Sequence, residues 1–131
     1  MATLAAPAGT GTPNIVTLSS AQTGNGQSTN VADRGTNEPN PTGTALLTIV
    51  TTVGATPTVT VAIEGSVDNS DWFSVAYATT AAPETVAVTT FAITTATTTR
   101  MILRPNHPWR YLRLTYSANT NVTSTATLAV F

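Results

Sequence analysis

The stretch Thr58–Gly65, TVTVAIEG, decides the fold class of this chain. Its larger apolar side chains, Val59, Val61 and Ile63, stand at every second position, with smaller or polar residues between them. A period of two residues with one apolar face is typical of a half-buried antiparallel strand. The stretch therefore predicts a strand that lays its valine and isoleucine side chains on a core.

Further strands are predicted along the chain, at 14–21, 45–53, 72–79, 84–95, 99–103, 109–117 and 124–130. Turn residues separate them, and Asp68–Asp71 (DNSD) is typical of a hairpin turn. The apolar residues of 84–95 change phase, which indicates a bulge or a strand that passes between sheets. No segment shows a helical period. About eight short strands predict an all-β, antiparallel β-sandwich, jelly-roll-like, forming one domain over residues 14–131.

Two segments lack this alternation. Residues 1–13 are small and include two prolines and two glycines, so we expect an extended N-terminal arm. Residues 22–44 are rich in Gly, Asn, Thr and Pro, which predicts a long polar loop. Loops of this length are uncommon inside compact domains and are often functional. We therefore expect this loop to become ordered against a partner.

The composition is unusually poor in charge. Charged residues make up 8% of the chain, lysine is absent, and about thirty residues are threonine; an ordinary soluble domain has about 25% charged residues. A threonine hydroxyl brings no charge that a partner must desolvate, and interface cores are depleted in charge. This favours a surface that is largely covered in an assembly over the alternative, a monomer with a hydroxyl-rich surface.

The few charges are sorted along the chain. Four of the five arginines lie at or after residue 100, and every acid lies before residue 85: Asp33, Glu38, Glu64, Asp68, Asp71 and Glu84. Four arginines without lysine or a basic tail make a poor phosphate footprint, so we expect no nucleic-acid partner. The N-terminus does not resemble a signal peptide, and no run approaches the ~20 apolar residues of a membrane span. We therefore expect no membrane partner.

Catalytic and metal-binding patterns are weak. His107 lies between Pro105 and Pro108 and has no nucleophile or carboxylate near it in the sequence, as a catalytic histidine requires. The chain has no cysteine, and the turn at 68–71 lacks the remaining oxygen ligands of a calcium loop. Asp33 and Glu38 could join a metal site or pair with arginines. We expect no enzyme activity, no cofactor, no metal and no small-molecule substrate.

The segment 100–116, RMILRPNHPWRYLRLTY, holds most of the residues suited to contact. Within it, Leu112, Leu114 and Tyr116 share one strand face, which we expect to be core with Arg110 near its edge. Trp109, Tyr111 and Arg113 share the other face. Trp, Tyr and Arg are enriched at binding hot spots, although both faces could equally be buried. The candidate interface residues are Arg34, Arg100, Arg104, Trp109, Arg110, Tyr111 and Arg113.

Two segments carry a family resemblance: 63–79, IEGSVDNSDWFSVAYAT, and 108–130, PWRYLRLTYSANTNVTSTATLAV. With them, residues 45–131 resemble the capsid decoration, or cement, proteins of tailed bacteriophages, which are small β-sandwich proteins. The resemblance implies a virion protein, made in the host cytoplasm, that binds the outer surface of the lattice of the major capsid protein. It also implies a homotrimer that reinforces the head.

The same segments also resemble discoidin-type carbohydrate- or lipid-binding sandwiches. That alternative implies a glycan-binding module of a phage tail or fibre, with Trp72, Trp109 and Tyr111 as the sugar platform. A third possibility is a tail or head–tail structural subunit.

Overall fold

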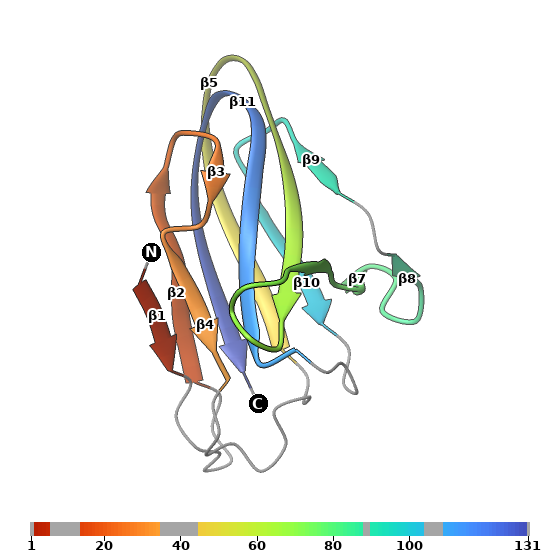
Figure 1. The fold of residues 1–131 in the computed structure, drawn as a ribbon. Helices are drawn as coiled ribbons and strands as arrows, with labels where there is room; N and C mark the ends of the chain where they lie inside the picture. The colour runs from red at the N-terminus through yellow and green to blue at the C-terminus, as the bar shows by residue number, and fades with distance from the viewer. Residues whose placement is uncertain (1, 6–13, 35–44, 88–89, 104–108, 131) are drawn as a thin grey trace.

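The computed structural model describes residues 2–5, 14–34, 45–87, 90–103 and 109–130. These residues form eleven strands (Figure 1): β1 (Ala2–Ala5), β2 (Asn14–Gln22), β3 (Gly26–Gln27), β4 (Asn30–Asp33), β5 (Ala45–Ser66), β6 (Phe73–Ser74), β7 (Tyr77–Thr79), β8 (Val86–Ala87), β9 (Phe91–Ile93), β10 (Thr98–Leu103) and β11 (Tyr111–Val130). Within this part of the chain no helix has the length and apolar character needed to cross a membrane. The predicted all-β class is confirmed.

Two long strands, β5 and β11, form the centre of the fold. They run antiparallel over their whole length, from the pair Ala45 and Val130 to the pair Ser66 and Tyr111. Figure 1 shows both strands arching over together at the top of the molecule. The strands predicted at 45–53 and 58–65 are thus the two halves of β5, and those predicted at 109–117 and 124–130 are the halves of β11. Both halves of β11 pair with β5 and not with each other.

The bends coincide with residues in the left-handed backbone region. Thr56 in β5 has φ 44°, and Ala118 and Asn121 in β11 have φ 51° and 53°. The Asn121 side-chain amide donates a hydrogen bond of 2.7 Å to the carbonyl of Ala55, which ties the two bends together. Asparagine tolerates this conformation well, whereas threonine and alanine adopt it at a cost. Because both strands bend at the same level, the β5–β11 ladder resumes beyond the bend.

The other strands extend the ladder on either side. The first half of β5 pairs with β10, followed by β7 and β8, and its second half pairs with β6 and β9. The second half of β11 pairs with β2, and its first half pairs with β3 and β4. All strands belong to one mostly antiparallel sheet that does not close. The jelly-roll arrangement of a sandwich therefore stays a prediction.

The core lies between the two halves of this folded sheet. One cluster of buried side chains joins Leu47 and Ile49 from the first half of β5 to Val59, Val61 and Ile63 from the second half. The alternation predicted for 58–65 is confirmed, because these three residues are buried while Thr60, Ala62 and Glu64 are partly exposed. Each fully buried side chain of this size contributes about 1.5–3 kcal/mol to stability. The outer surfaces of the two halves lie on opposite sides of the shared core.

The predicted polar loop 22–44 is partly strand. Its residues 26–27 and 30–33 form β3 and β4 against β11, and Val31 is buried. Ser28 fixes this pairing, since its amide donates to the Leu114 carbonyl (2.7 Å) and its hydroxyl accepts from the Leu114 amide (3.1 Å). The loop prediction was wrong here because pairing to β11 outweighs a weak local strand preference. Residues 35–44 lie outside the described residues.

Two other predicted segments also contain short paired strands. Within the predicted N-terminal arm, Ala2–Ala5 form β1 parallel to β4, and residues 6–13 lie outside the described part of the chain. The predicted strand 84–95 is divided into β8, which pairs with β7, and β9, which pairs with β5. Its change of phase therefore marks a segment that moves from one half of the folded sheet to the other.

Candidate interaction surface

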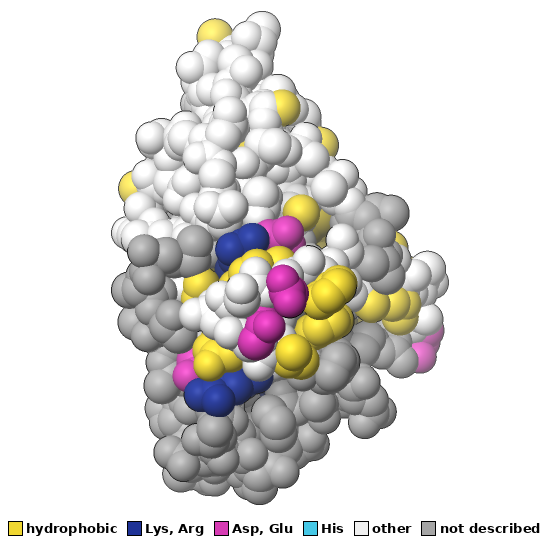
Figure 2. Space-filling view, in the orientation of Figure 1, with side chains coloured by type: hydrophobic (Ala, Val, Ile, Leu, Met, Phe, Trp, Pro, Cys, Tyr) yellow, Lys and Arg dark blue, Asp and Glu magenta, His cyan; other side chains and the backbone are white. Residues whose placement is uncertain are grey.

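Most of the charged and larger hydrophobic side chains on the face of Figure 2 gather over its lower half, whereas its upper half is nearly free of charge. We define the aromatic–arginine cluster as a set of residues from β4, β5, β6, β11 and the segments just before β6 and β11 that are joined by ring contacts and ion pairs: Trp72, Phe73, Trp109, Arg110, Tyr111, Arg113, Asp33 and Glu64. Four of its members are candidate interface residues from the sequence.

The ring of Trp109 packs against Gly65 of β5. A Cβ atom at Gly65 would lie 2.4 Å from Cγ of Trp109, so only glycine lets the indole approach the β5 backbone this closely. The ring also stacks on Phe73, with centroids 5.4 Å apart and planes at 16°. Phe73 is 53% exposed despite this contact. The stacked pair therefore presents an apolar, partly open surface at the start of β11.

Arg113 is held between an acid and an aromatic ring. Its Nε donates to Oε1 of Glu64 at 2.9 Å, across the β5–β11 ladder. The guanidinium carbon lies 3.9 Å from the centroid of the Trp72 ring, within the range of a cation–π interaction. The Thr115 hydroxyl donates to the same carboxylate oxygen. The side chains of Arg113 and Glu64 are only 15% and 24% exposed, so the pair is partly protected from water.

Arg110 joins β11 to β4. Its Nε and one terminal nitrogen donate to the two carboxylate oxygens of Asp33, at 2.8 and 3.0 Å. This two-point pairing matches the planar fork of arginine. The hydrogen bond to Asp33 raises the pKa of Arg110 above its ordinary value. Arg110 also lies over the Tyr111 ring, 4.9 Å from its centroid. Of the two sequence alternatives for Asp33, the structure shows pairing with arginine.

The turn at 66–71 borders the cluster. Oδ1 of Asp68 accepts hydrogen bonds from the amides of Ser70 and Asp71, each 2.9 Å long, and from the Ser66 hydroxyl. These donors, led by the Asp71 amide, lower the pKa of Asp68. Asn69 adopts φ 61°, as a tight turn requires. The predicted hairpin turn is confirmed by the pairing of β5 with β6, whereas the predicted strand 72–79 is divided into β6 and β7, and β7 pairs with β10. In the described parts of the chain, no three acids or histidines gather as a metal site.

The structure separates the candidate interface residues. Trp109, Arg110, Tyr111 and Arg113 come together in the aromatic–arginine cluster, and each of the two arginines has a carboxylate partner upstream in the same chain. Arg34 is 1% exposed, so its side chain is not accessible to another protein in this conformation. Arg100 is exposed on β10.

Arg104 and His107 lie outside the described residues, as does Glu38. Sequence reasoning missed the roles of Glu64 and Gly65. The outward phase of Glu64 in 58–65 was the available signal for an acid on an exposed face, but its register with Arg113 depends on strand pairing.

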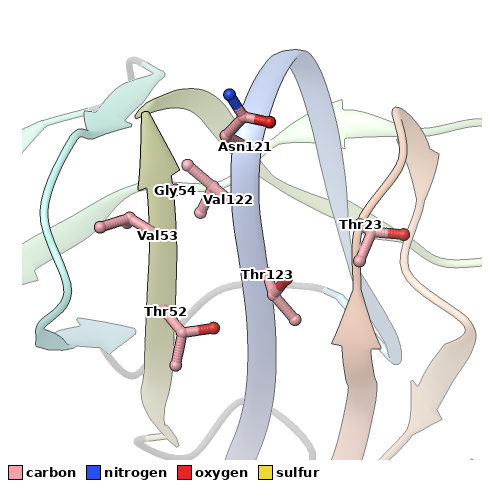
Figure 3. A pocket seen from close by; sticks show the side chains of 7 residues that line it. All are labelled: Thr23, Thr52, Val53, Gly54, Asn121, Val122 and Thr123. Atoms are coloured by element: carbon pink, nitrogen blue, oxygen red, sulfur yellow. The ribbon is translucent and has the colours of Figure 1, made fainter. Parts of the chain in front are cut away.

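A shallow hollow of about 420 Å³ lies beside the bend of β5 and β11 (Figure 3). Seven residues line it: Thr23, Thr52, Val53, Gly54, Asn121, Val122 and Thr123. None of these side chains titrates, so the hollow offers hydroxyl, amide and methyl groups without a fixed charge. The hollow therefore lacks an acid or a base of its own.

No protein-family model matches the chain, and no curated protein matches it by sequence. Among solved structures, the fold is similar to the crystal structure of the SPBc2 prophage-derived protein YomS, with a TM-score of 0.60. The similarity covers 91% of this chain and 93% of that chain at 8% sequence identity. At that identity the similarity concerns the fold alone. The chain therefore shares its overall all-β architecture, over nearly its full length, with a prophage-derived protein.

Proposed function

We propose that this chain is a virion structural protein of a tailed bacteriophage, and that it binds the outer surface of the major-capsid lattice as a homotrimer and stabilises the head. The observation that carries the proposal is the similarity of fold to a prophage-derived protein over nine-tenths of both chains. The more specific assignment, to the capsid decoration proteins, rests on the resemblance of residues 63–79 and 108–130 to those proteins. Synthesis in the host cytoplasm and assembly onto the shell belong to the same proposal.

The surface of the aromatic–arginine cluster is suited to contact with another protein. The charges of Arg110 and Arg113 are already neutralised by ion pairs with Asp33 and Glu64, so a partner protein does not have to supply carboxylates for these two arginines. Phe73 and Val67, which are 53% and 55% exposed, add apolar area beside them. Aromatic rings with pre-positioned arginines lose little conformational entropy when a partner covers them. Binding a repeated lattice would multiply each modest contact.

Electron microscopy of the particle tests the proposal directly. Cryo-electron microscopy of virions should show density for this chain on the outside of the shell at positions of local threefold symmetry. Purified protein should also bind expanded capsids and raise the temperature at which they release DNA. Location in the tail, ring symmetry of six or twelve, or absence from the particle would each contradict the assignment to the capsid.

The glycan-binding alternative has less support in the geometry. All three rings proposed for its sugar platform already have partners: Trp109 stacks on Phe73, Trp72 lies against Arg113, and Tyr111 lies under Arg110. A sugar would have to displace these contacts or use the remaining ring surface. A glycan array on which the protein binds a defined oligosaccharide, with loss of binding in Trp109→Ala, would favour this alternative over capsid binding.

A further inference from the structure

A second surface, on the opposite side of the core from the aromatic–arginine cluster, is the outer face of β2, β10, the first half of β5 and the second half of β11. We call it the threonine face. Along these strands, outward side chains alternate with buried ones: in β5, Leu46, Thr48 and Val50 lie outside, between the buried Leu47 and Ile49. The alternation shows that one side of this four-stranded region faces the core, while the side chains on the other side are partly or fully exposed.

Strand register arranges the threonine face in rows. The first row is apolar and consists of Ile15, Ala129, Leu46 and Ile102. The second row consists of Thr17, Thr127, Thr48 and Arg100. The third row consists of Thr125, Val50 and Thr98. The face thus combines methyl and hydroxyl groups with one charged group.

Two apolar residues of this face are strongly exposed, and the other three, Leu46, Ile102 and Ala129, are half-buried. Ile15 is 70% exposed and Val50 is 47% exposed. Arg100 is also exposed, and no ion pair joins it to an acid in the described part of the chain. In this respect Arg100 differs from Arg110 and Arg113, whose carboxylate partners are on neighbouring strands. The threonine face therefore carries an unneutralised positive charge beside uncovered apolar side chains.

We propose that the threonine face is a docking surface for a different protein, whose surface is weakly charged and offers a carboxylate to Arg100. This inference rests on the proposed function, under which that protein is the major-capsid lattice. Removing threonine and valine from water costs little polar desolvation, whereas Arg100 requires a partner charge once it is covered. The carboxylate would fix the orientation of the chain on its partner.

A second copy of the chain fits the threonine face poorly. None of the eleven residues in the three rows is an acid, so symmetric pairing of two such faces would cover both Arg100 side chains without a carboxylate. Four strands ~4.8 Å apart and about six residues deep give a plane of roughly 400 Å², against the ~800 Å² that each partner of a stable complex buries. A surface of this size binds firmly only when many copies act together on a repeating partner.

Single cysteines can report which face is covered, because the natural chain has none. Val50→Cys places a thiol on the threonine face, and Ala92→Cys places one at an exposed position of β9, on the other half of the sheet. Both thiols should react with a maleimide in the free protein. In purified virions we expect labelling at position 50 to fall at least about tenfold, while position 92 remains reactive.

The outcomes separate the inference from the proposed function. Protection at position 50 with reactivity at 92 supports both. A protein that is present on the shell but remains reactive at position 50 overturns the inference and leaves the proposed function intact. A protein that is absent from the shell overturns both. A soluble dimer that protects position 50 in the absence of capsids also overturns the inference, because a second copy would then be the occupant.

The binding of charge variants to expanded capsids provides a second, independent test of the docking surface. Val50→Lys and Arg100→Glu should each weaken binding by about tenfold or more, since each places an unmatched charge in the contact. Ala92→Lys is the matched control and should bind like the natural protein. Equal binding by all three variants, with unchanged melting temperatures, would show that the threonine face is not the docking surface.

Discussion

Gly65 is the residue that allows Trp109 to lie on β5. Because an added Cβ would lie 2.4 Å from the Trp109 ring, Gly65→Ala must displace the indole or shift the strand. We expect a loss of about 1–3 kcal/mol in the free energy of unfolding, in the range of overpacked sites. Chemical denaturation measures this loss, and a change in tryptophan fluorescence should accompany it.

Gly24 is the matched control for this substitution. A Cβ at Gly24 meets nothing within 4 Å, so Gly24→Ala should leave both stability and tryptophan fluorescence nearly unchanged. If Gly65→Ala behaves like Gly24→Ala, Trp109 is not seated on β5 as described, and the aromatic–arginine cluster is not a fixed structure.

Tyr116 gives the chain a sensitivity to alkaline pH. Burial raises the pKa of its hydroxyl, and the hydroxyl donates to Ser19 at 3.1 Å. Because the pKa is higher in the folded than in the unfolded chain, the stabilising contribution is complete below about pH 10 and is lost as the pH rises through the folded-state pKa. Stability measured between pH 8 and 12 should therefore fall at the alkaline end.

Tyr116→Phe removes this titration. The variant should lose about 1 kcal/mol at neutral pH, because the Ser19 hydroxyl loses its partner, and should show a flatter alkaline profile. Tyr111, which is only partly buried, supplies the comparison as Tyr111→Phe. An unchanged alkaline profile in Tyr116→Phe would show that other groups cause the loss of stability.

At the scale of elements, the hairpin between β5 and β6 should open in acid. Its turn is organised by the carboxylate of Asp68, whose pKa is lowered by the amides that donate to it. A lowered pKa means that the contribution is complete above the ordinary range of an aspartate and is lost as the pH falls through the folded-state value. Exchange of the Ser70 and Asp71 amides should therefore increase below about pH 4, relative to the intrinsic exchange rate at each pH.

Asp68→Asn tests whether this charge is responsible. The amide oxygen can still accept a hydrogen bond, but its interaction with the turn does not change between pH 2 and 6. The variant's relative exchange at Ser70 and Asp71 should accordingly be independent of pH. A variant that keeps the acid-dependent opening would assign the effect to another carboxylate.

At the scale of the whole molecule, stability should be concentrated in β5 and β11. These strands have neighbours on both edges and supply much of the buried core, whereas β8 pairs with β7 alone among the described strands. Native-state hydrogen exchange should place the slowest amides in the two halves of β5 and β11, at the free energy of global unfolding. The amides of β8 should exchange through local opening at much lower free energy. Uniform protection would contradict this hierarchy.

Local sequence determined the all-β class, the inward face of 58–65 and the hairpin turn at 68–71, because alternation and turn chemistry act between residues close in the chain. It also identified the inward and outward faces of 111–116, whereas Trp109, predicted on the outward face, packs against the core. In contrast, it predicted two strands where β5 is one bent strand, and a loop where β3 and β4 pair with β11. Pairing energy comes from neighbours distant in sequence, so local preference could not decide these points.

The same distinction applies to the two surfaces. Composition determined that the surface is neutral and rich in threonine, and the sorting of acids and arginines required the arginines to find partners elsewhere. Only strand register placed Glu64 opposite Arg113 and Asp33 beside Arg110, while leaving Arg100 among threonines on the other side of the core. Register fixes which side chains face each other across a sheet, and it is set by the tertiary fold.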